Sequence, residues 1–311
     1  MDIKELQYRQ SWTLTQKIDH SIGAIEAFIN QTGKVPYISF SGGRDSTVLL
    51  DIARRFVDRD IKAVYCNTGN EFPEIIRFVR QTENVTIIRP AITVKEVIAK
   101  YGFPLISKEQ AQGIRNAKTT KSPKLLAIRL YGSDPSKGHT TGKISNRWQF
   151  LINEPFMVSE KCCDCLKKRP FARYHKETGE VPIIGTLAGE SDMRKRQHIR
   201  RGGCNSFSEN HIASYPISIW TDNDIREYLR KFKVPYCPIY DIPGVDRTGC
   251  MVCGFGAHIE KISRFGLLND LHPKAYQHFM NYTNNGITYR EALRRIGVEL
   301  PDERRQLKLF E

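Results

Sequence analysis

Hydrophobic residues recur at helical spacing near the start of the chain and then fall into short apolar blocks. Leu14, Ile18, Ile22, Ile25 and Ile29 lie three or four positions apart, which predicts a helix over residues 11–30. The short apolar runs that follow predict strands, and the amphipathic stretches between them predict helices. The expected strands are residues 36–40, 61–66, 85–89 and 181–186, and the expected helices are residues 46–57, 73–82, 94–101 and 190–197.

Two further helix starts carry the three-residue spacing of a capping box, Thr221 with Asp224 and Thr288 with Glu291. Strands that alternate with helices predict an α/β fold: a parallel twisted sheet with helices on both faces and ligands at the carboxyl ends of the strands. A stretch rich in Ser, Thr, Gly and Lys interrupts this alternation and is expected to be an insertion or mobile lid. We expect an N-terminal helical segment, an α/β domain with that insertion, and a cysteine-rich, mostly helical C-terminal portion. Their expected bounds are 1–32, 33–235 with the insertion at 107–150, and 236–311.

Positive charge dominates the composition, with 48 Lys and Arg against 34 Asp and Glu, a formal net charge of +14. Half of that excess lies in residues 108–147, where nine Lys and Arg accompany only Glu109 and Asp134. A second acid-free cluster comprises Arg194, Lys195, Arg196, Arg200 and Arg201. A solvated surface explains many charged runs, but two separate clusters favour a polyanionic partner. Charge alone does not distinguish DNA from RNA.

The apolar residues do not form a membrane or export signal. No run approaches 18 consecutive apolar residues, and the first ten residues, MDIKELQYRQ, lack the apolar stretch of a signal peptide. We therefore expect a cytoplasmic protein without a membrane partner.

The segment SFSGGRDSTVLL, residues 39–50, joins an expected strand to an expected helix. Backbone N–H groups and the helix dipole favour an anion at such a junction, and glycines let the backbone approach it closely. The spacing of a Walker loop is absent. A glycine pair before a helix is often only a turn, so the pair alone leaves the ligand open.

The longer string SGGRDS, Ser41 to Ser46, resembles the PP-loop motif SGGxDS of ATP pyrophosphatases. This resemblance implies that the loop holds the pyrophosphate of ATP and that the chain cleaves ATP between its α and β phosphates. Asp45 is the expected catalytic residue that positions Mg²⁺, since charge on the departing pyrophosphate must be neutralised. The expected nucleotide-binding residues of the loop are Ser41, Gly42, Gly43, Arg44, Ser46 and Thr47.

Four downstream segments resemble the phosphoadenosine phosphosulfate (PAPS) reductase family in the same order. They are VYCNTGNEFPE (64–74), GTLAGESDMRKR (185–196), YPISIWTDNDIREYL (215–229) and YCPIYDIPGVDRTGCMVCGFGAH (236–258). The resemblance implies further nucleotide-binding residues, namely Asn67, Thr68, Glu71, Glu190 and Ser191.

Arg194 is the second expected catalytic residue, because its permanent planar charge suits a departing pyrophosphate. A turn and a helix cap are the competing interpretation of Asn67 and Glu71. The sequence departs from the family pattern at Leu187, where an arginine is usual.

Eight cysteines in a chain expected to be cytoplasmic favour metal or catalytic sites over disulfides. Cys250 and Cys253 have a chelating CxxC spacing, and Cys162 and Cys163 are adjacent. Adjacent cysteines suit one tetrahedral zinc ion poorly, whereas a cluster of several irons relaxes that constraint.

The same cysteine pattern resembles the iron–sulfur members of the reductase family. That resemblance implies a 4Fe-4S cluster on Cys162, Cys163, Cys250 and Cys253, with zinc as the less favoured alternative. Cys165 is a possible replacement ligand. Cys66 is expected in the core, and Cys204 is either a mobile thiol or an inert buried one.

Sulfonucleotide reductases of this family attack sulfur with a cysteine near the C-terminus, and no cysteine follows Cys253. The resemblance therefore favours the members that adenylate an oxygen with ATP and replace it by sulfur, as in DNA phosphorothioation and tRNA thiolation. It implies an ATP-dependent sulfurtransferase with a cysteine desulfurase as sulfur donor. Two alternatives stay open: a phosphoadenylyl- or adenylylsulfate reductase that uses Cys204, and a nucleotide-sensing DNA-binding module without turnover.

The last residues contain QLKLF, which resembles the QLxLF peptide by which bacterial proteins dock onto the DNA sliding clamp. Docking would use Gln306, Leu307, Leu309 and Phe310. The alternative is a terminal segment that folds onto its own core. Docking on the clamp would favour DNA over tRNA as the nucleic acid.

Overall fold

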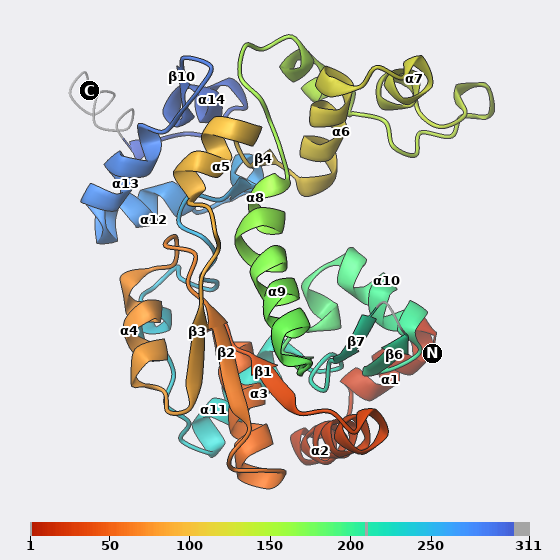
Figure 1. Cartoon of the computed structure of the whole chain (residues 1–311), viewed down its shortest axis with the longest axis vertical. Helices are drawn as coiled ribbons and strands as arrows, with labels where there is room; N and C mark the ends of the chain where they lie inside the picture. The colour runs from red at the N-terminus through yellow and green to blue at the C-terminus, as the bar shows by residue number, and fades with distance from the viewer. Residues whose placement is uncertain (1, 209–210, 302–311) are drawn as a thin grey trace. The chain divides into compact units, whose positions relative to one another are not determined.

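The computed structural model describes residues 2–208 and 211–301, which form two compact units (Figure 1). The first unit comprises residues 1–67, 72–89 and 170–248. The second unit comprises residues 68–71, 90–169 and those from 249 onward. None of the described helices combines the length and apolarity needed to cross a bilayer.

The first unit is built on a six-stranded sheet of order β3-β2-β1-β5-β7-β6. All neighbouring strands are parallel except β6 and β7, which form an antiparallel hairpin at one edge. The buried Ile38 of the central strand β1 pairs with Ala63 on one side and Ile183 on the other. The expected α/β class is therefore confirmed. The strands are β1 (Pro36–Ser39), β2 (Lys62–Cys66), β3 (Val85–Ile88), β5 (Val181–Ile184), β6 (Asn205–Ser208) and β7 (His211–Ser214).

The helices of the first unit follow the predicted alternation. The helix expected over residues 11–30 begins at Leu14, because Thr13 and Gln16 form a capping box. The first unit also contains helix α9, which the apolar pattern did not predict. It packs on the sheet through Tyr174, whose ring centroid lies 5.3 Å from that of Tyr37. The helices are α1 (Ile3–Gln10), α2 (Leu14–Thr32), α3 (Arg44–Phe56), α4 (Pro73–Gln81), α9 (Arg169–Thr178), α10 (Asp192–Arg201) and α11 (Asp222–Lys231).

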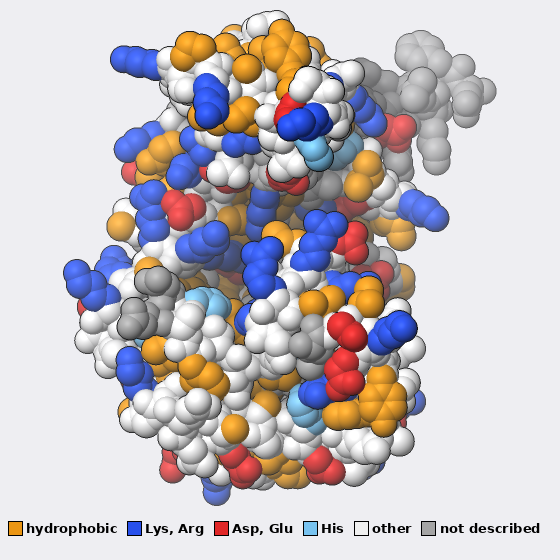
Figure 2. All heavy atoms as spheres, turned by 90° about the vertical axis from the view of Figure 1, so that its right-hand side faces the viewer, with side chains coloured by type: hydrophobic (Ala, Val, Ile, Leu, Met, Phe, Trp, Pro, Cys, Tyr) orange, Lys and Arg blue, Asp and Glu red, His pale blue; other side chains and the backbone are white. Residues whose placement is uncertain are grey.

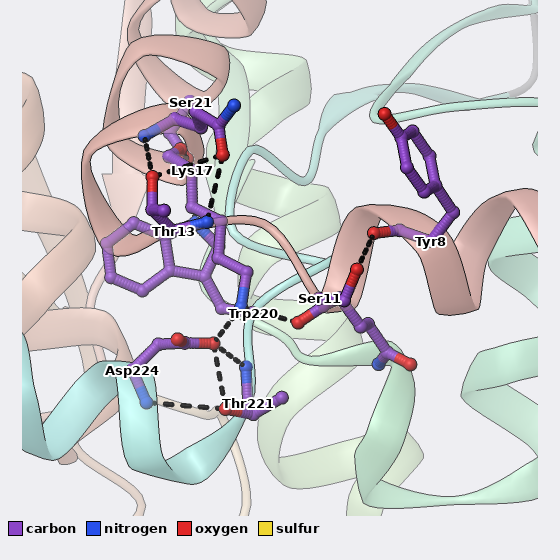
Figure 3. A network of polar contacts seen from close by, with 10 residues as sticks. Tyr8, Ser11, Thr13, Lys17, Ser21, Trp220, Thr221 and Asp224 are labelled. Atoms are coloured by element: carbon purple, nitrogen blue, oxygen red, sulfur yellow. Dashed lines mark hydrogen bonds and ion pairs between the residues drawn. The ribbon is translucent and has the colours of Figure 1, made fainter.

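A buried ion pair joins α2 to the start of α11 (Figure 3). Lys17 Nζ lies 2.7 Å from Asp224 Oδ2, and the two side chains are 2% and 12% exposed. Asp224 also accepts hydrogen bonds from the backbone and hydroxyl of Thr221, which confirms the predicted capping box. Trp220 Nε1 donates to Ser21 Oγ at 3.0 Å. These bonds fix Trp220 and Thr221, two residues that border the cavity described below.

The second unit gathers segments that are far apart in the sequence. Strand β4 pairs in parallel with β8, so that Leu105 lies opposite Gly254. Phe103 stacks on Tyr289 with ring centroids 5.2 Å apart, and both side chains are fully buried. Its helices are α5 (Val94–Tyr101), α6 (Lys108–Thr119), α7 (Pro123–Tyr131), α8 (Lys161–Cys163), α12 (Arg264–Leu271), α13 (Pro273–Met280) and α14 (Tyr289–Arg295). Its strands are β4 (Leu105–Ile106), β8 (Gly254–Phe255), β9 (Thr283–Asn284) and β10 (Ile287–Thr288).

Tertiary pairing makes these units differ from the division expected at residues 32/33 and 235/236. Residues 90–169 join the CxxC segment in one unit because β4 pairs with β8. The expected insertion at 107–150 contains two helices, α6 and α7, capped by Ser107 and Ser122. The second predicted capping box, Thr288 with Glu291, is also confirmed at the start of α14.

Candidate functional site

A cavity of about 770 Å³ lies in the first unit where β1 and β5 end. β1 lies between β2 and β5, so the chain order along the sheet reverses at this point. In open α/β sheets such a switch point is where ligands bind. Ser39 at the end of β1 and Ile184 at the end of β5 both line the cavity. The site therefore lies where the parallel sheet predicts it.

The loop after β1 has a backbone that only glycine adopts easily. Gly42 has a φ of +72°, and a Cβ on it would lie 2.9 Å from Ile75 Cγ2. Ser41 N donates to Ser46 Oγ at 3.2 Å, and Ser46 Oγ donates to the carbonyl of Gly43 at 3.0 Å. Gly43 caps α3 without a side-chain hydrogen bond, so the first N–H groups of α3 lack a side-chain acceptor at the cap. This is the arrangement that binds anions at helix starts.

Four guanidinium groups border the same cavity, those of Arg44, Arg194, Arg226 and Arg247. Arg44 is 8% exposed, donates to the carbonyl of Asp246 at 2.8 Å and stacks over Tyr240. Glu190 pairs with Arg194 and lies 3.6 Å from Arg247. Such planar, permanently charged groups suit a phosphate-bearing ligand.

The carboxyl group of Asp45 lies among these cations. Burial raises its pKa above the usual range, although Arg44 acts in the opposite direction. Burial likewise lowers the pKa of Arg194. Both shifts reflect charged groups withdrawn from water, which a ligand of complementary charge would stabilise.

The structure brings most of the predicted loop and arginine residues to this cavity. Its lining includes Ser41, Gly43, Arg44, Asp45, Ser46, Glu190 and Arg194. Gly42 shapes the loop, Thr47 donates to the carbonyl of Gly43, and Ser191 caps α10 by accepting from Arg194 N. Leu187 is buried and lines the cavity, so an apolar side chain stands where the family pattern has an arginine.

Besides Gly42, Thr47 and Ser191, three further predicted nucleotide-binding residues do not line the cavity. Asn67 belongs to the first unit, and its N–H donates to Ile88 O at 2.9 Å. Thr68 and Glu71 belong to the second unit. The Thr68 hydroxyl donates to Glu71 Oε1 at 2.8 Å and its N–H to Oε2 at 3.0 Å, which closes a buried turn.

Several cavity residues were not predicted as site residues. Apart from Ser39, Ile184, Gly185, Thr186, Leu187 and Gly189, they are Gln10, Trp220, Thr221, Asp222, Arg226, Tyr240, Asp246, Arg247 and Thr248. All except Gln10 lie within two segments quoted above for their family resemblance, 215–229 and 236–258. The family resemblance of those two segments indicated that they belong to the site, but no spacing rule identified which of their side chains line the cavity.

The second unit holds the CxxC segment in a turn with three supports. Cys253 N donates to Cys250 O at 2.9 Å, and Arg264 Nη1 donates to Cys253 O at 2.9 Å. Tyr289 Oη donates to Val252 O at 2.8 Å. A Cβ on Gly254 would lie 2.5 Å from this same Oη, so the glycine permits the close approach.

The thiols of Cys162, Cys163, Cys250 and Cys253 act electrostatically on one another. A hydrogen bond between the adjacent pair raises the pKa of Cys162 and lowers that of Cys163 to about 6, with Lys108 and Lys167 adding to the lowering. Burial raises the pKa of Cys250 to about 11, and it also raises the pKa of Cys253. Four clustered thiols resist joint ionisation unless a cation joins them.

Within the described residues, no three His, Cys, Asp or Glu side chains converge on a point suited to a single metal ion. A zinc ion needs sulfurs that each lie about 2.3 Å from one centre. Four thiols from two segments are a donor set used by structural zinc sites and by iron–sulfur clusters alike, so these residues fit either group chemically.

A family model described as "Phosphoadenosine phosphosulfate reductase domain" matches residues 35–127 and 109–254, which together span more than half of the chain. The chain belongs to this family. The matched residues include the loop after β1, Arg194 and the four clustered cysteines.

Two curated relatives are uncharacterized proteins of Methanocaldococcus jannaschii. One is 26% identical over 277 residues, which cover 87% of this chain and 53% of the relative. The other is 25% identical over 238 residues, which cover 75% of this chain and 39% of the relative. The chain thus spans about half, or less, of their lengths. A solved phosphoadenylyl-sulfate (PAPS) reductase from Candida auris, in a phosphate complex, covers 80% of this chain and is itself covered to 96%, with 14% identity and a TM-score of 0.41.

The other cysteines of this PAPS reductase family member are not disulfide-bonded. Cys66, Cys165, Cys204 and Cys237 are buried and form no disulfide bond. Cys204 Sγ lies 3.4 Å from His20 Nε2 beside a shallow cavity of about 460 Å³, and burial raises its pKa. A raised pKa disfavours the nucleophilic thiolate. The QLKLF segment, with Gln306, Leu307, Leu309 and Phe310, lies outside the described residues.

Proposed function

We propose that this PAPS reductase family member is an ATP-dependent sulfurtransferase that modifies nucleic acid. An oxygen of the acceptor attacks the α-phosphorus of ATP and pyrophosphate leaves. The terminal sulfur of a donor persulfide then attacks the adenylated position and displaces AMP, and a dithiol reductant supplies the two electrons that cleave the remaining S–S bond. The observation that carries the proposal is the cavity of about 770 Å³ that joins an anion-binding loop to four guanidinium groups. Its volume suits a nucleotide-sized ligand.

The chain's own residues have distinct parts in this reaction. The loop N–H groups at the start of α3 hold the phosphates. Arg194 and Arg247 stabilise the charge that develops on pyrophosphate as it departs. Asp45 would hold Mg²⁺, which would neutralise charge on the phosphates. Asp45 is half-buried and burial raises its pKa, so a cation beside it would favour the ionised form.

In the second unit, Cys162, Cys163, Cys250 and Cys253 would hold a 4Fe-4S cluster. When bound, the cluster supplies electrons or a sulfur-carrying position for the transfer. The sulfur donor we propose is a cysteine desulfurase, in keeping with the PP-loop resemblance. DNA is the favoured acceptor because of the resemblance of QLKLF to clamp-docking peptides.

The deciding experiment measures pyrophosphate and AMP release from labelled ATP by anaerobically purified protein. It is run alone, with DNA, with tRNA, and with adenylylsulfate plus thioredoxin. We expect stimulation by a nucleic acid, and by DNA more than tRNA. Sulfite release from adenylylsulfate without any nucleic-acid response would identify a reductase instead. ATP and DNA binding with no pyrophosphate under any condition would identify a sensing module.

A further inference from the structure

The insertion at residues 107–150 uses part of its positive charge to hold its own fold. The Arg115 guanidinium binds both carboxylate oxygens of Glu160, at 2.8 and 3.0 Å. Lys118 donates to the carbonyls of Glu154 and Phe156. Arg129 Nη1 donates to the carbonyl of Gly142 at 3.0 Å. These three cations are engaged within the second unit and are poorly placed for a partner.

Four of the six remaining cations of the insertion form a separate group. Lys121, Lys124 and Arg147 are exposed and Lys143 is half-buried. In the part of the chain that the structure describes, no carboxylate pairs with any of these four side chains. Their charge is therefore available to an external anion.

Asp134 is the single acidic residue between positions 110 and 153, and it does not neutralise this group of four cations. Asp134 accepts a hydrogen bond from Ser136 at 2.6 Å and lies 3.4 Å from Lys137. The Ser136 bond is the main cause that lowers its pKa. Asp134 therefore interacts with Ser136 and Lys137 of its own turn.

Exposed aromatic and apolar side chains accompany these cations. Helix α7 has the apolar sequence PKLLAIRLY, yet none of its residues is buried, and Tyr131 at its end is 62% exposed. Phe150 is 41% exposed, and Arg147 lies over the ring of Trp148. Figure 2 shows Lys and Arg side chains interspersed with hydrophobic ones on the face that carries the insertion.

Backbone contacts bring Lys143 and Arg147 to the Tyr131 end of α7. Ile144 N donates to Arg129 O at 2.8 Å, and Gln149 Nε2 donates to Leu130 O at 3.0 Å. Lys121 and Lys124 stand at the other end of α7, around its N-cap Ser122. Unpaired cations thus flank both ends of a helix that ends in an exposed tyrosine.

We propose that Lys121, Lys124, Lys143, Arg147 and Tyr131, here called the insertion surface, bind a single-stranded stretch of nucleic acid. The cations contact phosphates and a base stacks on Tyr131. Unpaired cations beside an exposed ring are how proteins hold unstacked strands, whereas an acidic protein partner would need no stacking ring. The inference rests on the proposed function in taking the acceptor to be nucleic acid, and it adds where and in what form that acceptor binds.

The test is fluorescence anisotropy of the full chain, purified anaerobically and without ATP, on single-stranded and duplex DNA of one sequence. Lys121→Glu/Lys124→Glu is expected to weaken single-strand binding at least tenfold. The plot of log affinity against log salt should flatten by about 1.4, since each phosphate contact on a single strand contributes about 0.7. Glu near the start of α7 complements the helix dipole, so the helix is retained.

A second variant addresses the stacking ring. Tyr131→Ala is expected to weaken single-strand binding by about 5- to 150-fold, from about 1–3 kcal/mol per stacked base, and to leave duplex binding unchanged. The matched control is Lys95→Glu/Lys274→Glu, which reverses two exposed lysines on other helices of the same unit. It should retain binding within about twofold, because these lysines lie outside the proposed contacts.

The insertion surface would be excluded if the Lys121/Lys124 variant bound like the wild type, or if the control lost as much affinity. Displacement of the DNA by polyglutamate at equal charge concentration would also overturn it, in favour of an acidic protein partner. Failure here is distinguishable from failure of the proposed function. Charge-dependent binding without pyrophosphate release would support the insertion surface and contradict the sulfurtransferase activity. Nucleic-acid-stimulated pyrophosphate release that persists in the Lys121/Lys124 variant would support the sulfurtransferase activity and contradict the insertion surface.

Discussion

The cavity at the ends of β1 and β5 and the thiol cluster formed by Cys162, Cys163, Cys250 and Cys253 are built in opposite ways. The loop of the cavity is one continuous stretch, residues 41–47, whose shape depends on Gly42 and on hydrogen bonds among its own members. The thiols come from two separate segments, and the turn that holds Cys250 and Cys253 depends on Arg264 and Tyr289. A site made from adjacent residues forms with its strand and helix, whereas a site made from distant ones requires the whole unit.

The charges of the two regions differ as well. In the cavity, arginines already face carboxylates, as Arg194 and Arg247 do with Glu190. Among the groups that act on the four thiols, the cations are Lys108, Lys167 and Arg264. The cavity can therefore persist without its ligand, while the thiol cluster is expected to depend on what it binds.

The largest effect is expected from Cys250→Ser, which removes one of the four thiolate ligands proposed for the cluster. Iron content and visible absorbance of the anaerobically purified protein should be lost completely, because a hydroxyl is a poor substitute ligand for iron. ATP binding, measured by calorimetry, should be retained. Full iron content in this variant would contradict the assignment of the cluster to these cysteines.

Asp45→Asn is the reciprocal change in the cavity. We expect pyrophosphate release to fall by at least about 10³-fold, because the amide cannot hold Mg²⁺ as a carboxylate does. Iron content and absorbance should equal those of the wild type. A simultaneous loss of iron would show that the two sites do not fail independently.

Lys17→Met tests how much the buried Lys17–Asp224 ion pair, next to the cavity residues Trp220 and Thr221, stabilises the fold. Removing Lys17 leaves Asp224 without its buried partner, which should cost about 3–5 kcal/mol in the free energy of unfolding measured with urea. Lys17→Met/Asp224→Asn is the matched control. It should recover most of that loss, since no unpaired charge remains and the cap to Thr221 is kept.

The smallest effect concerns pH and the buried His198, whose Nδ1 lies 3.0 Å from Ser218 Oγ. Burial, aided by Arg201, lowers the pKa of His198 from 6.5 to about 4. The unfolded chain therefore binds a proton first as pH falls, so stability present above pH 6.5 is lost toward pH 4, by up to about 3 kcal/mol.

His198→Asn keeps an acceptor toward Ser218 but does not titrate. Its unfolding free energy should change less between pH 7 and pH 4 than that of the wild type, as urea titrations at several pH values would show. An identical pH slope in both proteins would exclude His198 as the source.

Much of the fold could be predicted from the sequence because its signals are local. Thr13, Thr221 and Thr288 start helices through hydrogen bonds to residues three positions ahead, and the apolar runs at β1, β2 and β5 are each buried by their own composition. Helix α7 and the β6–β7 hairpin escaped prediction because their patterns are weak. No residue of α7 is fully buried, and the hairpin NSFS…HIAS is short and polar.

The sequence by itself determined the conformation of the loop after β1, since Gly42 and the serines around it shape the backbone through their immediate neighbours. It also indicated the cysteine pattern, but not which side chains hold that pattern in place. Only the tertiary structure decided that Thr68 and Glu71 close a turn in the second unit, that Arg115 and Lys118 are engaged internally, and that Lys121 and Lys124 are not. The physical reason is that φ angles and caps depend on adjacent residues, whereas burial and charge pairing depend on segments that meet only when the chain has folded.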